Sequence, residues 1–282
     1  MAALHLCPFQ PLLFRRVHSL FHLTFGLFLL LGLCVQAAQP VQYPTEMATI
    51  YEMGVEKRLV LPDEDRLHYA QLLVVALEQA RITVLRDQFV VMVDRSPLVQ
   101  AVFIYWLPVI GTPLFIGASP ASTGRPGRFD YFETPLGVFE HTLDSLDFRA
   151  EGTKNEFGIK GYGEKGMRVY DFGWQLANKG WGNRSPSIMR LQMHATDPDF
   201  LEARLGSAQS KGCIRIPASL NQLIDLYGLL DADYEQALLE GKRWWMLHPN
   251  RQATPWSGRY LVVVETWRTE RPALGRDIRE MT

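Results

Sequence analysis

The sequence of 282 residues contains only three cysteines, and two of them, Cys7 and Cys34, lie in an N-terminal segment with the features of a leader. Once that leader is removed, Cys213 is the one remaining thiol, so the mature chain cannot form an internal disulfide. An unpaired cysteine in an oxidising compartment is a chemical liability and usually has a use. The scarcity of cysteine therefore makes Cys213 the first candidate for a reactive residue.

Other features that define protein classes are also missing. The chain has 29 Lys and Arg against 30 Asp and Glu, and without Arg15 and Arg16 of the leader the balance is 27 against 30, a net charge of −3. This balance shows no basic excess, which argues against a nucleic-acid partner. The His and Cys residues lack metal-ligand spacing, so we expect neither a metal nor another cofactor.

The N-terminal segment 1–37 predicts a secretory signal peptide. Arg15 and Arg16 precede the apolar run Leu20–Leu33, and small residues follow at Ala37 and Ala38. We expect cleavage after Ala37 or Ala38 and a location in the periplasm or cell envelope. An uncleaved anchor is the alternative, because the apolar run is near the lower limit for a membrane span.

The rest of the chain predicts an α+β fold that is mainly β with flanking helices. Residues 38–87 are expected to form an N-terminal helical segment, in which Asp63 caps a helix that buries Leu67, Ala70, Val74 and Leu77. From Gln88 the pattern changes to short β-rich runs broken by Pro and Gly. We expect a main domain over 88–230 and a C-terminal extension over 231–282 that completes it with a helix and strands at Arg243–Leu247 and Tyr260–Val264.

Cys213 lies in the run Ser210-Lys211-Gly212-Cys213-Ile214-Arg215. Alternation predicts a short strand in which Ile214 and Ile216 enter the core while Cys213 and Arg215 share the exposed face. The upstream strand 188–194 would place His194 on its polar face, with Arg190 and Gln192. We therefore expect a cysteine nucleophile with a histidine base close by.

The neighbours of Cys213 suit thiolate chemistry. A thiol with an ordinary pKa of about 8.5 is mostly protonated at neutral pH, so it needs a base such as His194. Lys211 and Arg215 are expected to favour the thiolate by their charge. Amides near Gly212 and Cys213 could hold a developing oxyanion.

Several other residues have more than one interpretation. His141 could be a base on a neighbouring strand, although a surface or strand role is simpler. We expect the acidic residues Asp144, Asp147, Glu151 and Glu156 to form a solvated face, because their spacing shows no catalytic pair. The turn-rich segment 173–186 carries Trp174 and Trp181, which could form a lid over a site or cover a satellite core.

The chain resembles the L,D-transpeptidase catalytic domain family (YkuD type) in two motifs. His194, fifteen intervening residues and then Ser210-x-Gly212-Cys213-Ile214-Arg215 are similar to the family signature. The segments Ala121–Gly124 and Thr134–Phe139 are similar to its "S-T-G … T-P-x-G-x-F" stretch. Two departures are Lys211, where the family usually has histidine, and Ala195, where Gly or Ser is commoner.

The resemblance implies an L,D-transpeptidase-like β-sandwich catalytic domain over 88–230, and an exported cysteine acyl-transferase. Such enzymes attack peptidoglycan tetrapeptide stems through an acyl-cysteine, here on Cys213, and an amine of another stem or of a wall-attached protein resolves it. Arg215 would contact a stem carboxylate, brace the oxyanion site or form a salt bridge within the fold, and Ser210 and Lys211 would belong to the substrate-binding loop. Water as acceptor gives an L,D-carboxypeptidase instead, and a noncatalytic envelope-binding module is the alternative of another class.

Overall fold

The computed structural model describes residues 41, 43–268, 270 and 272, so the signal peptide expected over 1–37 lies outside the described residues. The helices are α1 (Pro44–Gly54), α2 (Asp63–Gln79), α3 (Ala218–Tyr227) and α4 (Ala232–Leu239), with a short 3-10 helix η1 (Glu202–Arg204). The strands are β1 (Gln88–Asp94), β2 (Ala101–Leu107), β3 (Leu114–Pro120), β4 (Gly137–Glu140), β5 (Phe148–Arg149), β6 (Arg168–Asn178), β7 (Pro186–Ala195), β8 (Ile214–Ile216) and β9 (Tyr260–Val264).

The strands form two sheets, which confirms the α+β class. A five-stranded sheet has the order β3-β2-β1-β9-β4, and a four-stranded sheet has the order β5-β6-β7-β8. Strand β9 comes from the C-terminal extension and inserts beside β1 in parallel, with Val91 opposite Leu261. The C-terminal extension therefore supplies an inner strand of the larger sheet.

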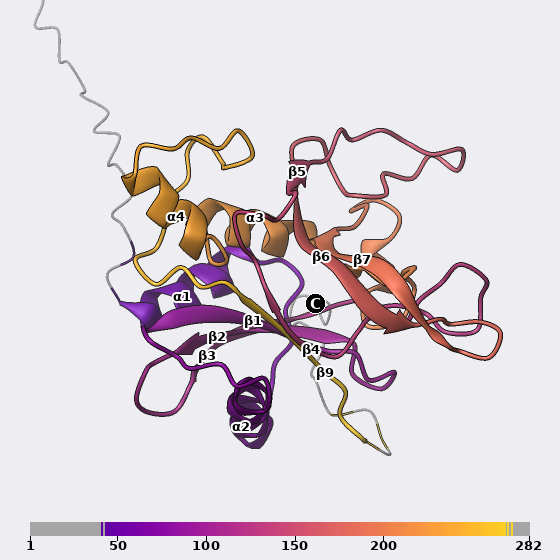
Figure 1. Cartoon of the computed structure of the whole chain (residues 1–282), viewed down its shortest axis with the longest axis horizontal. Coiled ribbons are helices and arrows are strands. Elements are labelled where there is room, and N and C mark those ends of the chain that lie inside the picture. Colours follow the sequence, from indigo (N-terminus) through magenta and orange to yellow (C-terminus); the bar gives the residue numbers. More distant parts are fainter. Residues whose placement is uncertain (1–40, 42, 269, 271, 273–282) are drawn as a thin grey trace, which may run out of the picture. The chain divides into compact units, whose positions relative to one another are not determined.

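Alternating side chains of β1 enter two different cores. Phe89, Val91 and Val93 pack into the larger cluster, which also contains residues of the four-stranded sheet, α1 and α3. Val90 and Met92 face the opposite way, into a cluster with α2. Because successive strand residues point to opposite faces, a strand covered on both sides is apolar throughout. Helices α1 and α2 accordingly lie on opposite sides of the five-stranded sheet (Figure 1).

The N-terminal helical segment differs in detail from the prediction. It forms two helices, and Asp63 is the first residue of α2 rather than its cap, which is Pro62. The buried face of α2 carries Tyr69, Ala70, Leu73 and Leu77, whereas Leu67 is 56% exposed. The tyrosine explains the rotation, because its ring stacks on Phe103 of β2 at 4.1 Å between ring centroids.

Two other sequence predictions are wrong. Residues 243–247 form no strand; Trp244, Met246 and Leu247 instead pack around Tyr234 of α4 in a small separate cluster, while Trp245 is 71% exposed. The segment 173–186 is not a loop throughout, because β6 continues to Asn178 and pairs with the start of β7. The long β6–β7 ribbon is prominent in Figure 1.

No helix within the described residues is long and apolar enough to cross a membrane.

Candidate active site

His194 lies on β7 of the four-stranded sheet, and Cys213 directly precedes β8, which pairs with β7 in parallel. Strands β7 and β8 pair with His194 opposite Arg215, and Cys213 comes two residues before Arg215. Because strand side chains alternate with a period of two, Cys213, Arg215 and His194 project from the same face. Ile214 and Ile216 are fully buried on the other face, as the sequence predicted.

The loop that carries Cys213 is held by the Ser210 hydroxyl. Ser210 Oγ donates to the Cys213 carbonyl at 2.5 Å and accepts the Gly212 amide at 3.0 Å. The Gly212 amide is therefore occupied and is not the free oxyanion donor that we expected. Gly212 has φ +133°, and a Cβ on it would lie 2.9 Å from the Met189 sulfur, so this position favours glycine over other residues.

The two motifs that carry the family resemblance meet at this loop. Ser122 and Arg215 form a backbone bridge, with both N–H to O distances 2.9 Å, and the amide of Ser210 donates to the Thr123 carbonyl. The buried Thr134 hydroxyl accepts the Gly124 amide and donates to the Gly212 carbonyl. The segment with Thr134 and the loop before Cys213, which are more than 70 residues apart in sequence, are thus hydrogen-bonded to each other.

His194 is positioned as a neutral base. It is 4% exposed, and its Nδ1 lies 2.6 Å from the Ala195 carbonyl oxygen, so Nδ1 carries the proton and Nε2 the free lone pair. Burial lowers the pKa of His194 to about 4, assisted by the nearby Arg215 guanidinium. The imidazole is therefore uncharged at neutral pH and able to accept a proton.

The cations that flank Cys213 do not lower the pKa of its thiol overall, although we expected them to favour the thiolate. Burial raises the pKa of Cys213, and the Gln192 backbone amide and Arg215 oppose this effect without overcoming it. Lys211 contributes little here, because its exposed ammonium pairs with Asp130 at 2.9 Å. The charge of Lys211 is therefore directed at an exposed acid and not at the sulfur.

Arg215 is a guanidinium without an acidic partner in the described part of the chain. It forms no ion pair there, and its Nε is buried and makes no hydrogen bond. Its neighbours in the site are Cys213 and Tyr131. A partly buried cation with unfilled donor capacity is a suitable group for binding a carboxylate.

The site is also bordered by residues that the sequence analysis did not single out. The Tyr162 ring contacts the His194 ring edge-on, 4.7 Å between centroids, and its hydroxyl donates to the Gln192 side chain. The buried Asp171 carboxylate binds Arg190 and Gln192. An aromatic between two glycines, as in Gly161-Tyr162-Gly163, was the signal available in the sequence for a loop over a site.

The two tryptophans of segment 173–186 do not act together. Trp174 lies on β6 with 68% of its surface exposed, opposite Arg190 of β7. Trp181 lies in the following turn, where its ring contacts Phe129 and Phe132 edge-on. Trp181 thus covers a small aromatic cluster, while Trp174 is exposed on the β6–β7 ribbon beside Arg190.

His141 belongs to a buried charge cluster and not to the surface. Its Nε2 lies 3.0 Å from the Asp147 carboxylate, and its Nδ1 lies 2.9 Å from the Leu230 carbonyl. Asp147 is also buried, which corrects its assignment to a solvated face; Asp144, Glu151 and Glu156 are exposed as predicted. Arg168 joins the cluster by ion pairs to Asp147 and to Asp231.

The cluster raises the pKa of His141. Burial by itself lowers the pKa of His141, but the Asp147 carboxylate reverses the effect, and the net shift is upward. Burial likewise favours protonated Asp147, whereas His141 and Arg168 bring its pKa down to about 2. His141 is thus a fully buried member of this cluster. Asp147 is only six residues away in sequence, but Leu230 and Asp231 come from a distant segment, so the sequence could not show its burial.

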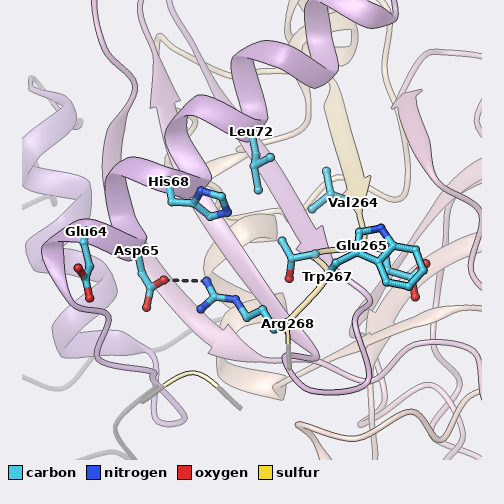
Figure 2. Close-up of a pocket in the computed structure, with 9 residues that line it drawn as sticks. Glu64, Asp65, His68, Leu72, Val264, Glu265, Trp267 and Arg268 are labelled. Carbon is cyan, nitrogen blue, oxygen red and sulfur yellow. Dashed lines mark hydrogen bonds and ion pairs between the residues drawn. The ribbon is translucent and has the colours of Figure 1, made fainter. Parts of the chain in front are cut away.

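A hollow of about 510 Å³ lies elsewhere, between α2 and the end of β9 (Figure 2). It is lined by Glu64, Asp65, His68, Leu72 and residues 264–268, and an ion pair joins Asp65 to Arg268 across it. None of these residues comes from the strands around Cys213. The chemistry described above therefore does not extend to this hollow.

No protein-family model and no curated protein matches this chain.

Proposed function

We propose that the protein is an exported cysteine acyl-transferase of the L,D-transpeptidase type, acting on peptidoglycan tetrapeptide stems. The observation that carries the proposal is the position of Cys213 directly before β8, the strand that pairs in parallel with β7 and places Arg215 opposite His194. The contact between the two family-like motifs, through Thr134 and Gly212, supports it. The two-sheet architecture with helices is compatible with the sandwich domain that the resemblance implies.

The proposed reaction begins from a neutral thiol and a neutral imidazole. His194 Nε2 takes the thiol proton as Sγ attacks the carbonyl carbon of the L,D peptide bond. The C–N bond then breaks, and the imidazolium returns the proton to the leaving amine of D-alanine. An acceptor amine, from another stem or from a wall-attached protein, attacks the thioester, loses its proton to His194 and releases the thiol.

The oxyanion that forms during attack needs donors near the sulfur. The Cys213 amide makes no hydrogen bond within the described residues, and it remains a candidate after the Gly212 amide is committed to Ser210. Arg215 would bind the carboxylate of the leaving residue, since a guanidinium suits that geometry. The Cys213 amide would stabilise the charge that develops on the oxyanion in the transition state.

Incubation with purified muropeptides, followed by mass analysis, tests the proposal. Cross-linked dimers and a stem acyl group on Cys213 are expected from the wild type, and neither from Cys213→Ala. Shortened stems without dimers would assign the water-using carboxypeptidase reaction instead. No product and no acyl-enzyme with any stem would leave a noncatalytic envelope-binding module and reject the proposal.

A further inference from the structure

Strand β7 has an open edge that ends at Cys213. Strand β8 covers only Met193–Ala195 of the ten-residue β7. On that side, no strand among the described residues pairs with the stretch 186–191. An uncovered edge presents main-chain N–H and C=O groups as a template for another extended chain.

The main-chain N–H and C=O groups that point toward this open edge are those of Ile188 and Arg190. The amide of Thr196 donates to the Ile216 carbonyl at 3.2 Å, and the amide of Gln192 contacts the Cys213 sulfur. Main-chain groups of every second strand residue point to the same side, so those of Ile188 and Arg190 point there too. The main-chain groups of Met189 and Leu191 point toward β6 instead.

The chain before β8 turns away from the edge instead of covering it. Gly212 packs against the side chain of Met189, which is buried in the core between the sheets. The Lys211 carbonyl accepts a hydrogen bond from the Phe132 amide at 3.0 Å, which anchors the loop to another segment. The position beside Arg190, where an N-terminal extension of β8 would lie, is therefore open to another chain.

We propose that the acyl-donor peptide binds in extended form along this edge, as an added strand hydrogen-bonded to the main chain of Ile188 and Arg190. The inference rests on the proposed function, and it names how the donor is held. Main-chain pairing of this kind is a recurrent mode of peptide recognition. It positions a carbonyl carbon at the thiol without requiring any particular side chain on the donor.

The position of β8 decides the direction of the peptide. Since β8 occupies the edge from Met193 onward, the acyl side of the peptide can leave Cys213 only toward Ile188. The donor thus runs parallel to β7, and its C-terminal leaving residue points toward Arg215. The unpaired guanidinium lies where a terminal carboxylate would arrive, which independently favours this direction.

Amide hydrogen exchange on Cys213→Ala, with and without a saturating tetrapeptide stem, tests the inference. Exchange at Ile188 and Arg190 should slow at least about tenfold, and exchange at Met189 and Met193 should not change, because both residues are paired with β6 and their main-chain groups point toward it. Bound stem without protection of Ile188 and Arg190 would overturn the inference. If the wild type turns over the same stem in that case, the proposed function survives; if no stem binds or reacts, both are rejected.

A pair of variants at one position gives a second measurement. Ile188→Pro removes an N–H from the open edge without removing a bond to β6, and Ile188→Ala removes the side chain but keeps that N–H. We expect kcat/KM to be about three- to tenfold lower for Ile188→Pro than for Ile188→Ala, the effect of one hydrogen bond. Equal values in two variants with unchanged iodoacetamide reactivity at Cys213 would contradict strand addition.

Discussion

The Thr134 hydroxyl donates a 2.7 Å hydrogen bond to the carbonyl of Gly212, the residue before the nucleophile. The same oxygen accepts the Gly124 amide at 2.9 Å, and the Thr134 side chain is fully buried. One side chain thus joins the turn after β3, the segment before β4 and the cysteine loop. The geometry of Cys213 depends on a residue 79 positions earlier in the sequence.

Thr134→Val should therefore slow acylation of Cys213. The substitution nearly preserves shape but leaves the Gly124 amide and the Gly212 carbonyl unpaired, at a cost of about 1–3 kcal/mol in unfolding free energy. A displaced loop should lower the acylation rate by roughly ten- to a hundredfold. Thr134→Ser keeps the hydroxyl and should recover most of the rate. Acyl-enzyme formation followed by mass spectrometry, beside denaturant unfolding, measures both effects; equal rates in the two variants would disprove the positioning role.

The thiol of Cys213 should titrate above its ordinary pKa, because burial favours the neutral form. Alkylation by iodoacetamide as a function of pH reports this value directly. Arg215→Met removes a charge that favours the thiolate and should move the profile to still higher pH. Lys211→Met should leave the profile in place, since Lys211 pairs with Asp130. A wild-type midpoint below that of a free thiol would show that a resting ion pair forms with His194.

His194→Ala should lower the acylation rate by on the order of a hundred- to ten-thousandfold, the usual range for general-base assistance. Single-turnover acylation with a stem substrate is the measurement. The buried His141 offers a comparison, because it has no access to the sulfur. Loss of acylation in a folded His141 variant, with normal acylation in His194→Ala, would reverse the assignment of the base.

His194 should also make the fold less stable in acid. The folded-state pKa of about 4 lies below the ordinary value of 6.5, so between these values the unfolded chain binds a proton that the folded chain does not. Stability should accordingly fall as the pH drops from 6.5 to 4, by about 3 kcal/mol from this residue. Unfolding free energies across this range should show a shallower slope for His194→Gln than for the wild type. Identical slopes would mean that the imidazole stays protonated in the fold.

His141 should have the opposite effect at higher pH. Its pKa is raised in the folded state, so its contribution to stability is complete below 6.5 and is lost as the pH rises through the folded-state pKa. His141→Ala should cost about 3–5 kcal/mol, because it leaves the Asp147 carboxylate buried with one partner fewer. The double variant His141→Gln/Asp147→Asn replaces the ion pair by a neutral one. In this double variant the stability should no longer fall as the pH rises above 6.5. If the stability still falls, a group other than His141 causes the loss.

Local patterns in the sequence were sufficient to predict the strand β8, which follows Cys213. Alternation placed Ile214 and Ile216 inside, and Cys213 and Arg215 outside, because the side-chain period of a strand is a local property. The strand at Tyr260–Val264 was also predicted correctly, whereas 243–247 was not, since an apolar run can pack on a helix as readily as on a sheet.

The charge states depended on tertiary structure. The sequence placed cations beside Cys213 and suggested a thiolate, but burial, which no neighbour in sequence reports, leaves the sulfur protonated. The same holds for His141, whose pKa is raised by Asp147, six residues away, and by Asp231, which comes from a distant segment. The sequence by itself determined which residues carry titratable or nucleophilic groups and on which side of a strand they lie. Only the tertiary structure decided which of them are charged, because desolvation and ion pairing arise where distant parts of the chain meet.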